Sequence, residues 1–414
     1  MSTTIPDQGA EPIEALPGQG TGRVRLIVLL GALSAFAPLS IDMYLPALPE
    51  LRRDLSGGAS QAQLTLSACL IGLALGQLLA GPVSDIYGRR RPLLIGVAAY
   101  AAGSLLCAAA PSIPLLVTFR FVQGFAGAAG IVIARAIVRD LHSGAALARF
   151  FSVLMLVSGS APILAPIVGA QLLRFTTWRG VFVALALIGL VLFIAAAMGL
   201  AETAPVRDRE TGAVRTSLAT FRQLASDRAF MRYALSGGFA IAAMFAYIAG
   251  SPFVLQEIYG VSQQRFSLMF GANALGIVAV SQINARLVAR IPPEHLLRIG
   301  LSAIATGGAL LLAVVSSGAL GLVGILPALF IVVASLGLVL PNTAALALAG
   351  QTRVAGTASA VLGLMQYAVG AFAAPLVGLG GETTALPMAI VIATAGSTAV
   401  LAFWLLGRVP TTVR

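Results

Sequence analysis

Two ionisable side chains lie inside long apolar stretches, where a charge costs on the order of a few kcal/mol and therefore needs a reason. The first is Asp42, in the segment Pro38–Pro46. A poorly hydrated site favours the protonated form of a carboxylate, so Asp42 could bind and release a proton in each working cycle. The alternative is an acidic residue near the end of a helix that caps the turn toward Pro46.

The second is Arg120, which lies one helical turn before Gln123 on the same face. An arginine keeps its proton under ordinary conditions, so it cannot carry a proton itself. It could instead pair with a carboxylate, tune it, or order water. The alternative is a side chain that extends from the outer end of its helix toward water.

A third group of residues joins an acid to several bases in the short polar segment that runs from Gly81 to Arg91. Asp85 could pair with Arg89, or bond a neighbouring helix, and so hold one conformation closed. A bistable element biased by a few such contacts can act as a gate. We predict a gate made of Gly81, Asp85, Gly88, Arg89 and Arg90. The alternative is a basic loop that only sets the orientation of the chain.

A stripe of small and helix-bending residues follows in the fifth apolar stretch. Gly159, Pro162, Pro166 and Gly169 recur at helical spacing. Small residues let helices approach closely and prolines bend them, so the stripe predicts a kinked, closely packed helix that could act as a pivot or seal. Ordinary packing is the alternative, since membrane helices tolerate both residue types.

The composition requires that lipid covers much of the surface. Of the 414 residues, 58% are hydrophobic and only 10% are charged, whereas soluble domains carry roughly 25% charged residues. A membrane-spanning helix needs ~20 apolar residues. We therefore predict an all-α integral membrane protein with twelve transmembrane helices, near 24–48, 62–83, 92–111, 113–138, 148–173, 178–200, 230–256, 266–289, 296–316, 320–348, 353–379 and 385–407.

The distribution of arginine gives an orientation. All 26 basic residues are arginine, and the net charge is +11. Nucleic-acid binding is not expected, because the arginines occupy short segments between apolar spans. With the N-terminus in the cytoplasm, 20 arginines fall on the cytoplasmic side, five on the other side, and Arg120 within the membrane. The positive-inside rule therefore places both termini in the cytoplasm.

The longest polar stretch divides the spans into two sets of six. We predict a disordered cytoplasmic tail at 1–22, an N-terminal six-helix bundle at 23–200, a cytoplasmic linker at 201–229, a C-terminal six-helix bundle at 230–408 and a second tail at 409–414. A shift of 204 residues brings Gly96 onto Gly300 and Gly103 onto Gly307. These coincidences fit a duplicated six-helix unit, as in many transporters.

Several classes of chemistry have no residues to support them. Cys69 and Cys107 lie in apolar spans, which suggests neither a disulfide framework nor a paired-cysteine metal site. His142 and His295 have no neighbouring ligand cluster. The chain has no Gly-rich phosphate loop of the GxxxxGK[ST] type, so ATP hydrolysis is not expected. We predict that the protein is not an enzyme and needs no cofactor or metal.

The loop and two helix segments resemble those of the major facilitator superfamily. Gly81-x-x-x-Asp85-x-x-Gly88-Arg89-Arg90-Arg91 is similar to its signature loop, with Ile86 where a basic residue is usual. Arg120-x-x-Gln123-Gly124 resembles the fourth-helix motif tied to proton coupling. Ala165-Pro166-x-x-Gly169-Ala170 resembles the fifth-helix antiporter motif, with alanine at two glycine positions.

Two further segments resemble the bicyclomycin/chloramphenicol-resistance (Bcr/CflA) group of drug:H⁺ antiporters, namely Ser40–Pro49 in the first span and Ser251–Gly260 at the end of the seventh. The resemblance implies proton-coupled efflux of small hydrophobic drugs or metabolites across a bacterial inner membrane. A proton symporter that imports a nutrient on the same fold is the alternative, and an uncoupled facilitator is a third reading.

From the residues themselves, we assign proton coupling to Asp42 and Arg120 and place the substrate between the two bundles. Aromatic faces with a few hydrogen-bonding groups suit loosely specified apolar ligands. The candidate lining residues are Phe36, Tyr44, Gln123, Met155, Tyr247, Asn273, Gln366 and Tyr367. The expected partners are a small-molecule substrate, protons and the lipid bilayer, with the protein a monomer.

Overall fold

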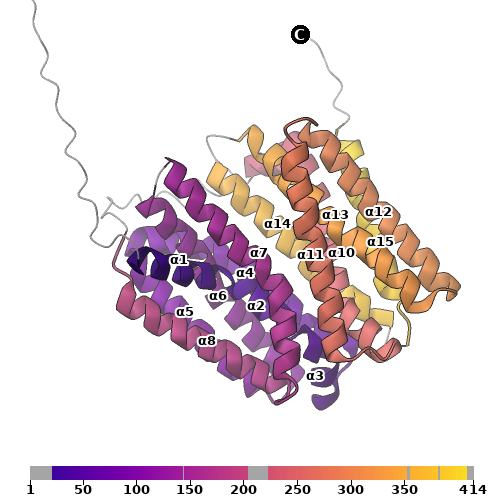
Figure 1. Cartoon of the computed structure of the whole chain (residues 1–414), viewed down its shortest axis with the longest axis horizontal. Helices are drawn as coiled ribbons and strands as arrows, with labels where there is room; N and C mark the ends of the chain where they lie inside the picture. The colour runs from indigo at the N-terminus through magenta and orange to yellow at the C-terminus, as the bar shows by residue number, and fades with distance from the viewer. Residues whose placement is uncertain (1–20, 143, 204–221, 352–354, 381–382, 408–414) are drawn as a thin grey trace, which may run out of the picture.

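The computed structural model describes residues 21–142, 144–203, 222–351, 355–380 and 383–407. They form two groups of helices that lie side by side (Figure 1). The N-terminal group contains α1 (Thr21–Ser34), α2 (Phe36–Asp42), the 3-10 turn η1 (Leu45–Ala47), α3 (Leu48–Asp54), α4 (Ala59–Tyr87), α5 (Arg90–Ala108), α6 (Ile113–Leu141), α7 (Gly144–Leu172) and α8 (Trp178–Gly199).

The C-terminal group follows after the predicted linker, of which residues 204–221 lie outside the described part of the chain. It contains α10 (Arg228–Phe253), the π-helical turn η2 (Val254–Ile258), α11 (Gln263–Leu287), α12 (Pro293–Ser317), α13 (Gly321–Ala349), α14 (Ala355–Leu376), the 3-10 turn η4 (Val377–Gly380) and α15 (Leu386–Leu406).

The predicted spans are confirmed as helices. Within the described ranges, nine helices are long and apolar enough to cross a membrane, and a bent pair in the first span would be a tenth. Two shorter apolar stretches complete the twelve, namely Gly159–Leu172 in α7 and Val361–Val377, which runs from α14 to the first residue of η4. The two closest pairs of predicted spans are separate helices, α5 with α6 and α12 with α13.

The first span is not the single helix that we predicted at 24–48. Its two halves, Arg25–Ser34 and Phe36–Asp54, are bent by 45°. Pro38 has no N–H to donate to the Ser34 carbonyl, so the helical bonding is interrupted there. Pro46 likewise cannot donate to the Asp42 carbonyl, and α2 gives way to the turn η1.

The predicted sequence repeat has a structural counterpart. A Cβ on Gly96 of α5 would overlap Ala129 on α6, and one on Gly300 of α12 would come within 2.9 Å of Leu338 on α13. Gly103 and Gly307 also face α6 and α13. The same two helices of each group therefore pack closely through glycines at equivalent positions, as a duplicated unit requires.

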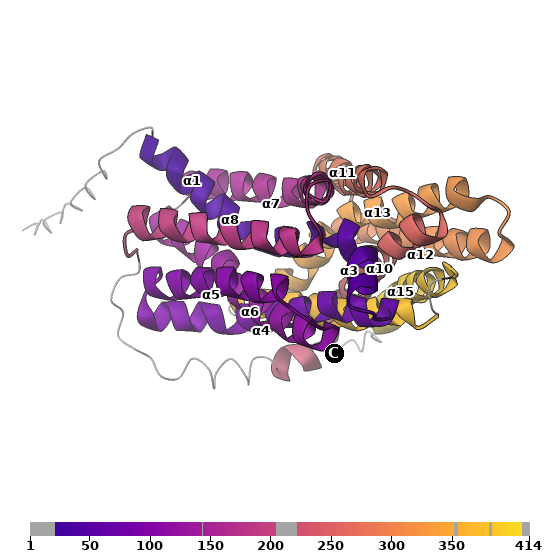
Figure 2. The same ribbon diagram turned by 90° about the horizontal axis from the view of Figure 1, so that it is seen from below.

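The two groups meet at one end of the molecule. We call the end where α1 begins and α15 ends the terminal end, and the opposite end, which holds α3, the far end (Figure 1). The ribbons of α7 and α11 converge toward the far end in this view. Seen from below, α3 lies where the groups meet, and it contacts α10 (Figure 2).

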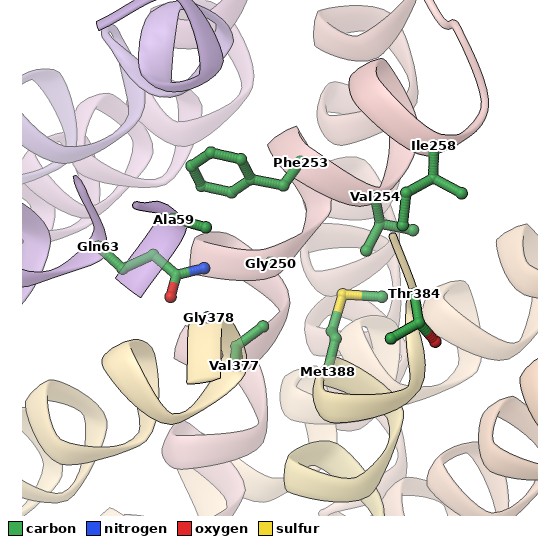
Figure 3. A pocket seen from close by; sticks show the side chains of 10 residues that line it. All are labelled: Ala59, Gln63, Gly250, Phe253, Val254, Ile258, Val377, Gly378, Thr384 and Met388. Atoms are coloured by element: carbon green, nitrogen blue, oxygen red, sulfur yellow. The ribbon is translucent and has the colours of Figure 1, made fainter. Parts of the chain in front are cut away.

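The side-chain hydrogen bonds that join described residues of the two groups gather in the far half of the molecule. Figure 3 shows a small pocket there, to which α4 contributes Ala59 and Gln63 and the C-terminal group contributes Gly250, Phe253, Val254, Ile258, Val377, Gly378, Thr384 and Met388. The described residues show no such bond between the groups at the terminal end. The described bonds therefore join the two groups at the far end.

Candidate functional site

Asp42 is the last residue of α2, and only 5% of its surface is exposed. It does not cap the turn η1, which has no side-chain capping bond, so the alternative of a capping acid is not supported. In the described part of the chain its carboxylate has no hydrogen-bond partner. A buried carboxylate without a partner is costly as a charge, and this cost falls when it binds a proton.

The C-terminal group brings one of the predicted residues, Tyr247, near Asp42, and Tyr247 is bonded to a second, Asn273. Tyr247 on α10 interacts electrostatically with the Asp42 carboxylate. Its hydroxyl accepts a hydrogen bond of 2.9 Å from Nδ2 of Asn273 on α11, and its ring stacks on Phe270 with centroids 5.3 Å apart. Asp42 therefore lies within electrostatic reach of a tyrosine of the other group, whose hydroxyl is held by Asn273.

Arg120 is fully buried in α6, which excludes a side chain extended toward water. Its Nη1 donates to Gln123 Oε1 at 2.5 Å, and its Nη2 donates to the Ser40 carbonyl at 2.9 Å. The guanidinium carbon also lies 4.5 Å from the centre of the Tyr44 ring. Among the described residues it has no carboxylate partner, and Nε has no hydrogen bond.

Arg120 and Asp42 are therefore connected through α2 and not through an ion pair. Ser40 lies in the last turn of α2, where carbonyls have no partner within the helix and the helix dipole is negative. Arg120 binds one of these carbonyls, and Asp42 ends the same turn. A movement of Arg120 would thus act on the position of Asp42 through two residues of backbone.

The other side chains around Arg120 have their partners inside the N-terminal group. Gln123 Nε2 donates to Ser104 Oγ at 2.7 Å. The Tyr44 hydroxyl lies 3.0 Å from Thr65 Oγ1. Phe36 stacks on Tyr100 with centroids 4.1 Å apart. The structure thus encloses three of the predicted lining residues, Phe36, Tyr44 and Gln123, among neighbours of their own group.

The remaining predicted lining residues lie elsewhere. Gln366 and Tyr367 on α14 are half-buried, and the side chain of Met155 lies outside the described part of the structure. Tyr367 interacts with Gln77 of α4 and with the charge of Arg135 on α6. Sequence reasoning missed Gln77, and it assigned Arg135 to the arginines that set the orientation.

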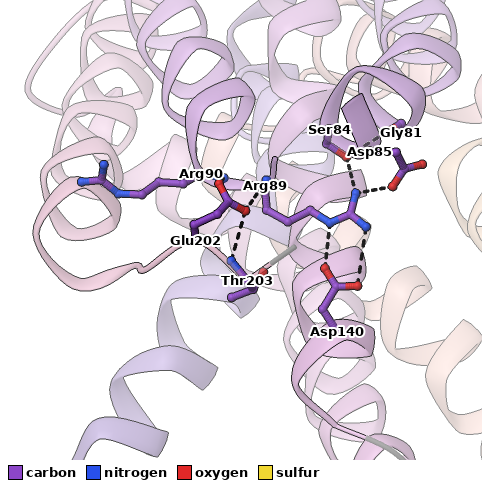
Figure 4. Close-up of polar contacts among 8 residues, drawn as sticks. All are labelled: Gly81, Ser84, Asp85, Arg89, Arg90, Asp140, Glu202 and Thr203. Carbon is purple, nitrogen blue, oxygen red and sulfur yellow. Dashed lines mark hydrogen bonds and ion pairs between the residues drawn. The ribbon is translucent and has the colours of Figure 1, made fainter. Parts of the chain in front are cut away.

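The predicted gate loop is organised around Arg89 (Figure 4). Its Nη1 donates to Asp85 Oδ1 at 2.5 Å, which confirms the predicted pair, and its Nε donates to Asp140 Oδ2 at 2.7 Å. Burial opposes the charge of Arg89, but the hydrogen bonds to Asp140 and Asp85 outweigh burial and raise the pKa of the guanidinium. Asp85 itself is exposed.

Glu202, which follows α8, completes this loop. Its two carboxylate oxygens accept the backbone N–H groups of Arg89 and Arg90, at 2.7 and 3.1 Å, so it caps the N-terminus of α5. Arg90 in turn donates to the carbonyls of Leu200 and Ala197. Sequence reasoning missed Asp140 and Glu202, although acids are scarce in this chain and both lie at helix ends on the arginine-rich side.

The two glycines of the gate loop differ in their surroundings. Gly88 has a φ of 85°, and a Cβ there would meet the Glu202 carboxylate at 2.5 Å. A Cβ on Gly81 would meet only Val132, at 3.9 Å. The loop therefore requires glycine at 88 for its backbone and its contact with Glu202, and the described surroundings do not require it at 81.

The stripe in α7 does not pack along one continuous surface. A Cβ on Gly169 would overlap the Met43 carbonyl oxygen, whereas one on Gly159 would meet nothing within 4 Å. Pro162 and Pro166 lie between them inside the helix. Of the two stripe glycines, Gly169 alone therefore makes a close backbone contact with the first span, although α7 also contacts α1 through other residues such as Val157.

Comparison with known proteins decides the family. The model of the Major Facilitator Superfamily matches residues 30–375. The chain belongs to the major facilitator superfamily. It is therefore a multi-pass membrane transporter and not an enzyme, and it has the twelve-helix fold of that superfamily.

Relatives of this transporter include proteins named for drug resistance. It is 45% identical over 93% of its length to the uncharacterized MFS-type transporter YdgK of Bacillus subtilis, covering 96% of that protein. It is 32% identical to the bicyclomycin resistance protein homolog of Haemophilus influenzae, covering 92% of this chain and 95% of that protein. It is 31% identical to a chloramphenicol resistance protein of Pseudomonas aeruginosa, with 81% and 79% coverage.

Solved structures share the fold of this major facilitator at low sequence identity. An inward-facing, occupied bacterial homolog of the human lysosomal transporter Spinster superposes with a TM-score of 0.75 at 14% identity, covering 94% of this chain and 98% of that one. A D-xylose–proton symporter gives a TM-score of 0.72 at 16% identity, with 94% and 98% coverage.

Proposed function

We propose that this transporter exports small hydrophobic drugs or metabolites from the bacterial cytoplasm in exchange for protons. The observation that carries the proposal is Asp42, a buried carboxylate without a partner among the described residues, at the interface between the two groups. The names of the relatives support drugs as the substrate class. Because the chain has no nucleotide-binding loop, the proton gradient is the energy source that remains.

Asp42 is the proposed proton carrier. An ionised Asp42 is unfavourable where it lies, so the carboxylate takes up a proton whenever water from the acidic side reaches it. Arg120 is the proposed tuning residue, and it acts through the Ser40 carbonyl at the end of α2. This chain of contacts would let a change at Asp42 alter the packing between the first span and α6.

The substrate is proposed to lie between the groups, close to Asp42. Tyr247 and Asn273 offer an aromatic face and a hydrogen-bonding pair from the C-terminal group, and Gln366 and Tyr367 extend this surface along α14. Phe36, Tyr44 and Gln123 are buried in the N-terminal group and would support the first span without contacting the substrate. Arg135 adds a positive charge between the groups that the predicted cavity did not include.

The Arg89 loop is the proposed cytoplasmic gate. This places the terminal end in the cytoplasm, in agreement with the predicted arginine distribution, and makes the far end the outer face. The described contacts between the groups then close the outer side, which corresponds to a state open toward the cytoplasm. The proposed bundle and tail boundaries, the inner-membrane location and the monomeric state belong to the same proposal.

The test is substrate-driven proton movement in vesicles that hold the purified protein and a pH dye, without an imposed gradient. An exchanger that takes up added drug must release protons, so the interior becomes alkaline. Asp42→Asn should abolish the response. Asp227→Asn is the matched control, because Asp227 caps α10 on the opposite group and asparagine caps a helix equally well. A full response from folded Asp42→Asn protein would refute the assignment.

The same assay distinguishes the proposed exchanger from a proton symporter and from an uncoupled facilitator. A symporter would carry protons inward together with the added compound, so the interior would become acidic. The fold of the D-xylose–proton symporter is compatible with this direction. A facilitator would take up compound with no change of pH in either direction.

A further inference from the structure

One face of α4 carries three polar side chains that bond the C-terminal group. Ser60 Oγ donates to the Pro375 carbonyl at 3.1 Å, Gln63 Nε2 to the Ala249 carbonyl at 3.0 Å, and Ser67 Oγ to the Ala371 carbonyl at 2.7 Å. Their spacing of three and four residues places them on one side of the helix. Gln63 and Ser67 are almost completely buried, at 1% and 3% exposed.

The acceptors are main-chain carbonyls, and a proline releases one of them. In an α-helix the Ala371 carbonyl would accept the N–H of residue 375, but Pro375 has none. A buried carbonyl without a partner is costly, so the hydroxyl of Ser67 satisfies a need that the sequence of α14 creates. The bond between Ser67 and Ala371 is thus a specific contact that joins the two groups.

The backbones approach closely at the same place. A Cβ on Gly378 of η4 would overlap the Ser60 nitrogen and would lie 2.5 Å from Gln63 Oε1. Figure 3 shows Gly378 beside the Gln63 amide, below Gly250. No side chain fits at 378 while the far end has this geometry.

We propose that Ser60, Gln63 and Ser67 on α4, together with Gly378, form a latch that holds the far end closed and must release for it to open. The proposal rests on the proposed alternating access, in which this end is the outer face. Each bond is neutral and individually modest, so a single loss shifts the open-to-closed ratio by about two- to tenfold. A latch of this strength closes the end and still releases within a working cycle.

The ion pair of Arg52 with Glu257 also bridges the groups at this end, at 3.2 Å, with side chains 17% and 18% exposed. It belongs to α3 and η2, outside the α4 stripe. Variants in α4 leave it in place, so they test the latch separately from the charges.

The experiment measures the opening of the far end directly. Spin labels on Gly58→Cys, before α4, and on Leu320→Cys, before α13, report the distance between the groups by pulsed electron resonance. Both positions are exposed, and a Cβ at 58 meets nothing within 4 Å. Cys69 and Cys107 are fully buried and are replaced by alanine in every protein compared.

Two kinds of variant, one that removes hydrogen bonds and one that adds a methyl group, should both favour opening of the far end. Gln63→Ala with Ser67→Ala removes bonds, and Gly378→Ala inserts a methyl group into the contact. Both should add a longer distance to the distribution, in a proportion several times that of the parent. The controls are Ser335→Ala, whose hydroxyl donates to the Ile331 carbonyl of its own helix, and Gly363→Ala on α14, where a Cβ meets nothing within 4 Å of the described structure.

An unchanged distribution in folded Gln63→Ala/Ser67→Ala protein would overturn the latch, as would an equal change in the two controls. If Gly378→Ala does not fold, the α4 variant alone decides. The measurement needs neither substrate nor a proton gradient. A protein that opens as expected but moves no protons would therefore leave the latch intact and refute the proposed exchange instead.

Discussion

Arg89 holds Asp140 through two of its guanidinium nitrogens, with Nε at 2.7 Å from Oδ2 and Nη2 at 3.5 Å from Oδ1. The two side chains are only 8% and 14% exposed, whereas the other acid bound by Arg89, Asp85, is 60% exposed. One arginine therefore has a sheltered partner on α6 and a solvent-facing partner on its own loop. The sheltered pair with Asp140 can persist throughout the working cycle, whereas the exposed Asp85 can exchange partners.

We predict that Asp140→Asn destabilises the protein much more than Asp85→Asn does. Removing the sheltered acid leaves a buried guanidinium short of charge and should cost about 3 kcal/mol. Loss of the exposed pair should cost below about 1 kcal/mol. Cys69 and Cys107 are fully buried, so a thiol-reactive dye that fluoresces on labelling can follow thermal unfolding. Equal shifts of the midpoint would contradict the division of roles.

The gate loop should tolerate alanine at one glycine and not at the other. Gly88 combines a φ of 85° with a ψ of 170°, a region that costs other residues about 1–3 kcal/mol. Gly88→Ala would also push away the Glu202 carboxylate that caps α5. We expect a clear loss of thermal stability in Gly88→Ala and little change in Gly81→Ala. Similar melting curves for the two variants would show that the loop has a freer backbone than described.

Arg120→Gln should separate stability from transport. The described neighbours of Arg120 are neutral, so its removal orphans no carboxylate, unlike the change at Asp140. We expect an unfolding midpoint close to that of the parent and loss of substrate-driven proton movement. Arg120→Lys should not restore it, because a single ammonium cannot reproduce the planar fork between Gln123 and Ser40. A large loss of stability in Arg120→Gln would reveal a charged partner.

The two glycines of α7 make a fourth comparison. Gly169→Ala would drive a methyl group into the Met43 carbonyl, next to Asp42, and should lower both stability and proton movement. Gly159→Ala meets open space and should leave stability unchanged or slightly improved, since alanine favours the helix. Vesicle assays and dye melting on the same preparations measure both properties. Comparable defects in both variants would mean that the stripe acts as one surface.

Hydropathy and arginine placement were sufficient to predict the helices, because a span has little freedom in length and each must alternate in direction. The break in the first span was missed, since Pro38 and Pro46 read equally well as tolerated membrane prolines. The pair of Asp85 with Arg89 was predictable from four residues of spacing. The contacts of Asp140 and Glu202 were not, because these acids lie 51 and 113 residues further along the chain and reach the loop only when α6 and α8 have packed.

The cavity predictions show the same limit. Phe36, Tyr44 and Gln123 have the composition of a binding surface, and their enclosure by Tyr100, Thr65 and Ser104 depends on rotations of α2 and α6 that no local pattern encodes. Tyr247 does interact with Asp42, and Asn273 is bonded to Tyr247. Whether a predicted lining residue is enclosed within its own group or lies at the interface depends on the direction in which its helix turns its polar face.

Because Pro375 has no N–H, the Ala371 carbonyl is available to Ser67, and the contact at the far end does not depend on the side chains of α14. Ser67 binds the main chain of α14, and the main chain is the same whichever side chains α14 carries. Descendants of this protein can therefore exchange the side chains of α14 and α10 while inheriting the closing contact unaltered. A change in the range of transported compounds and the preservation of the barrier against leakage then depend on different parts of the same helices.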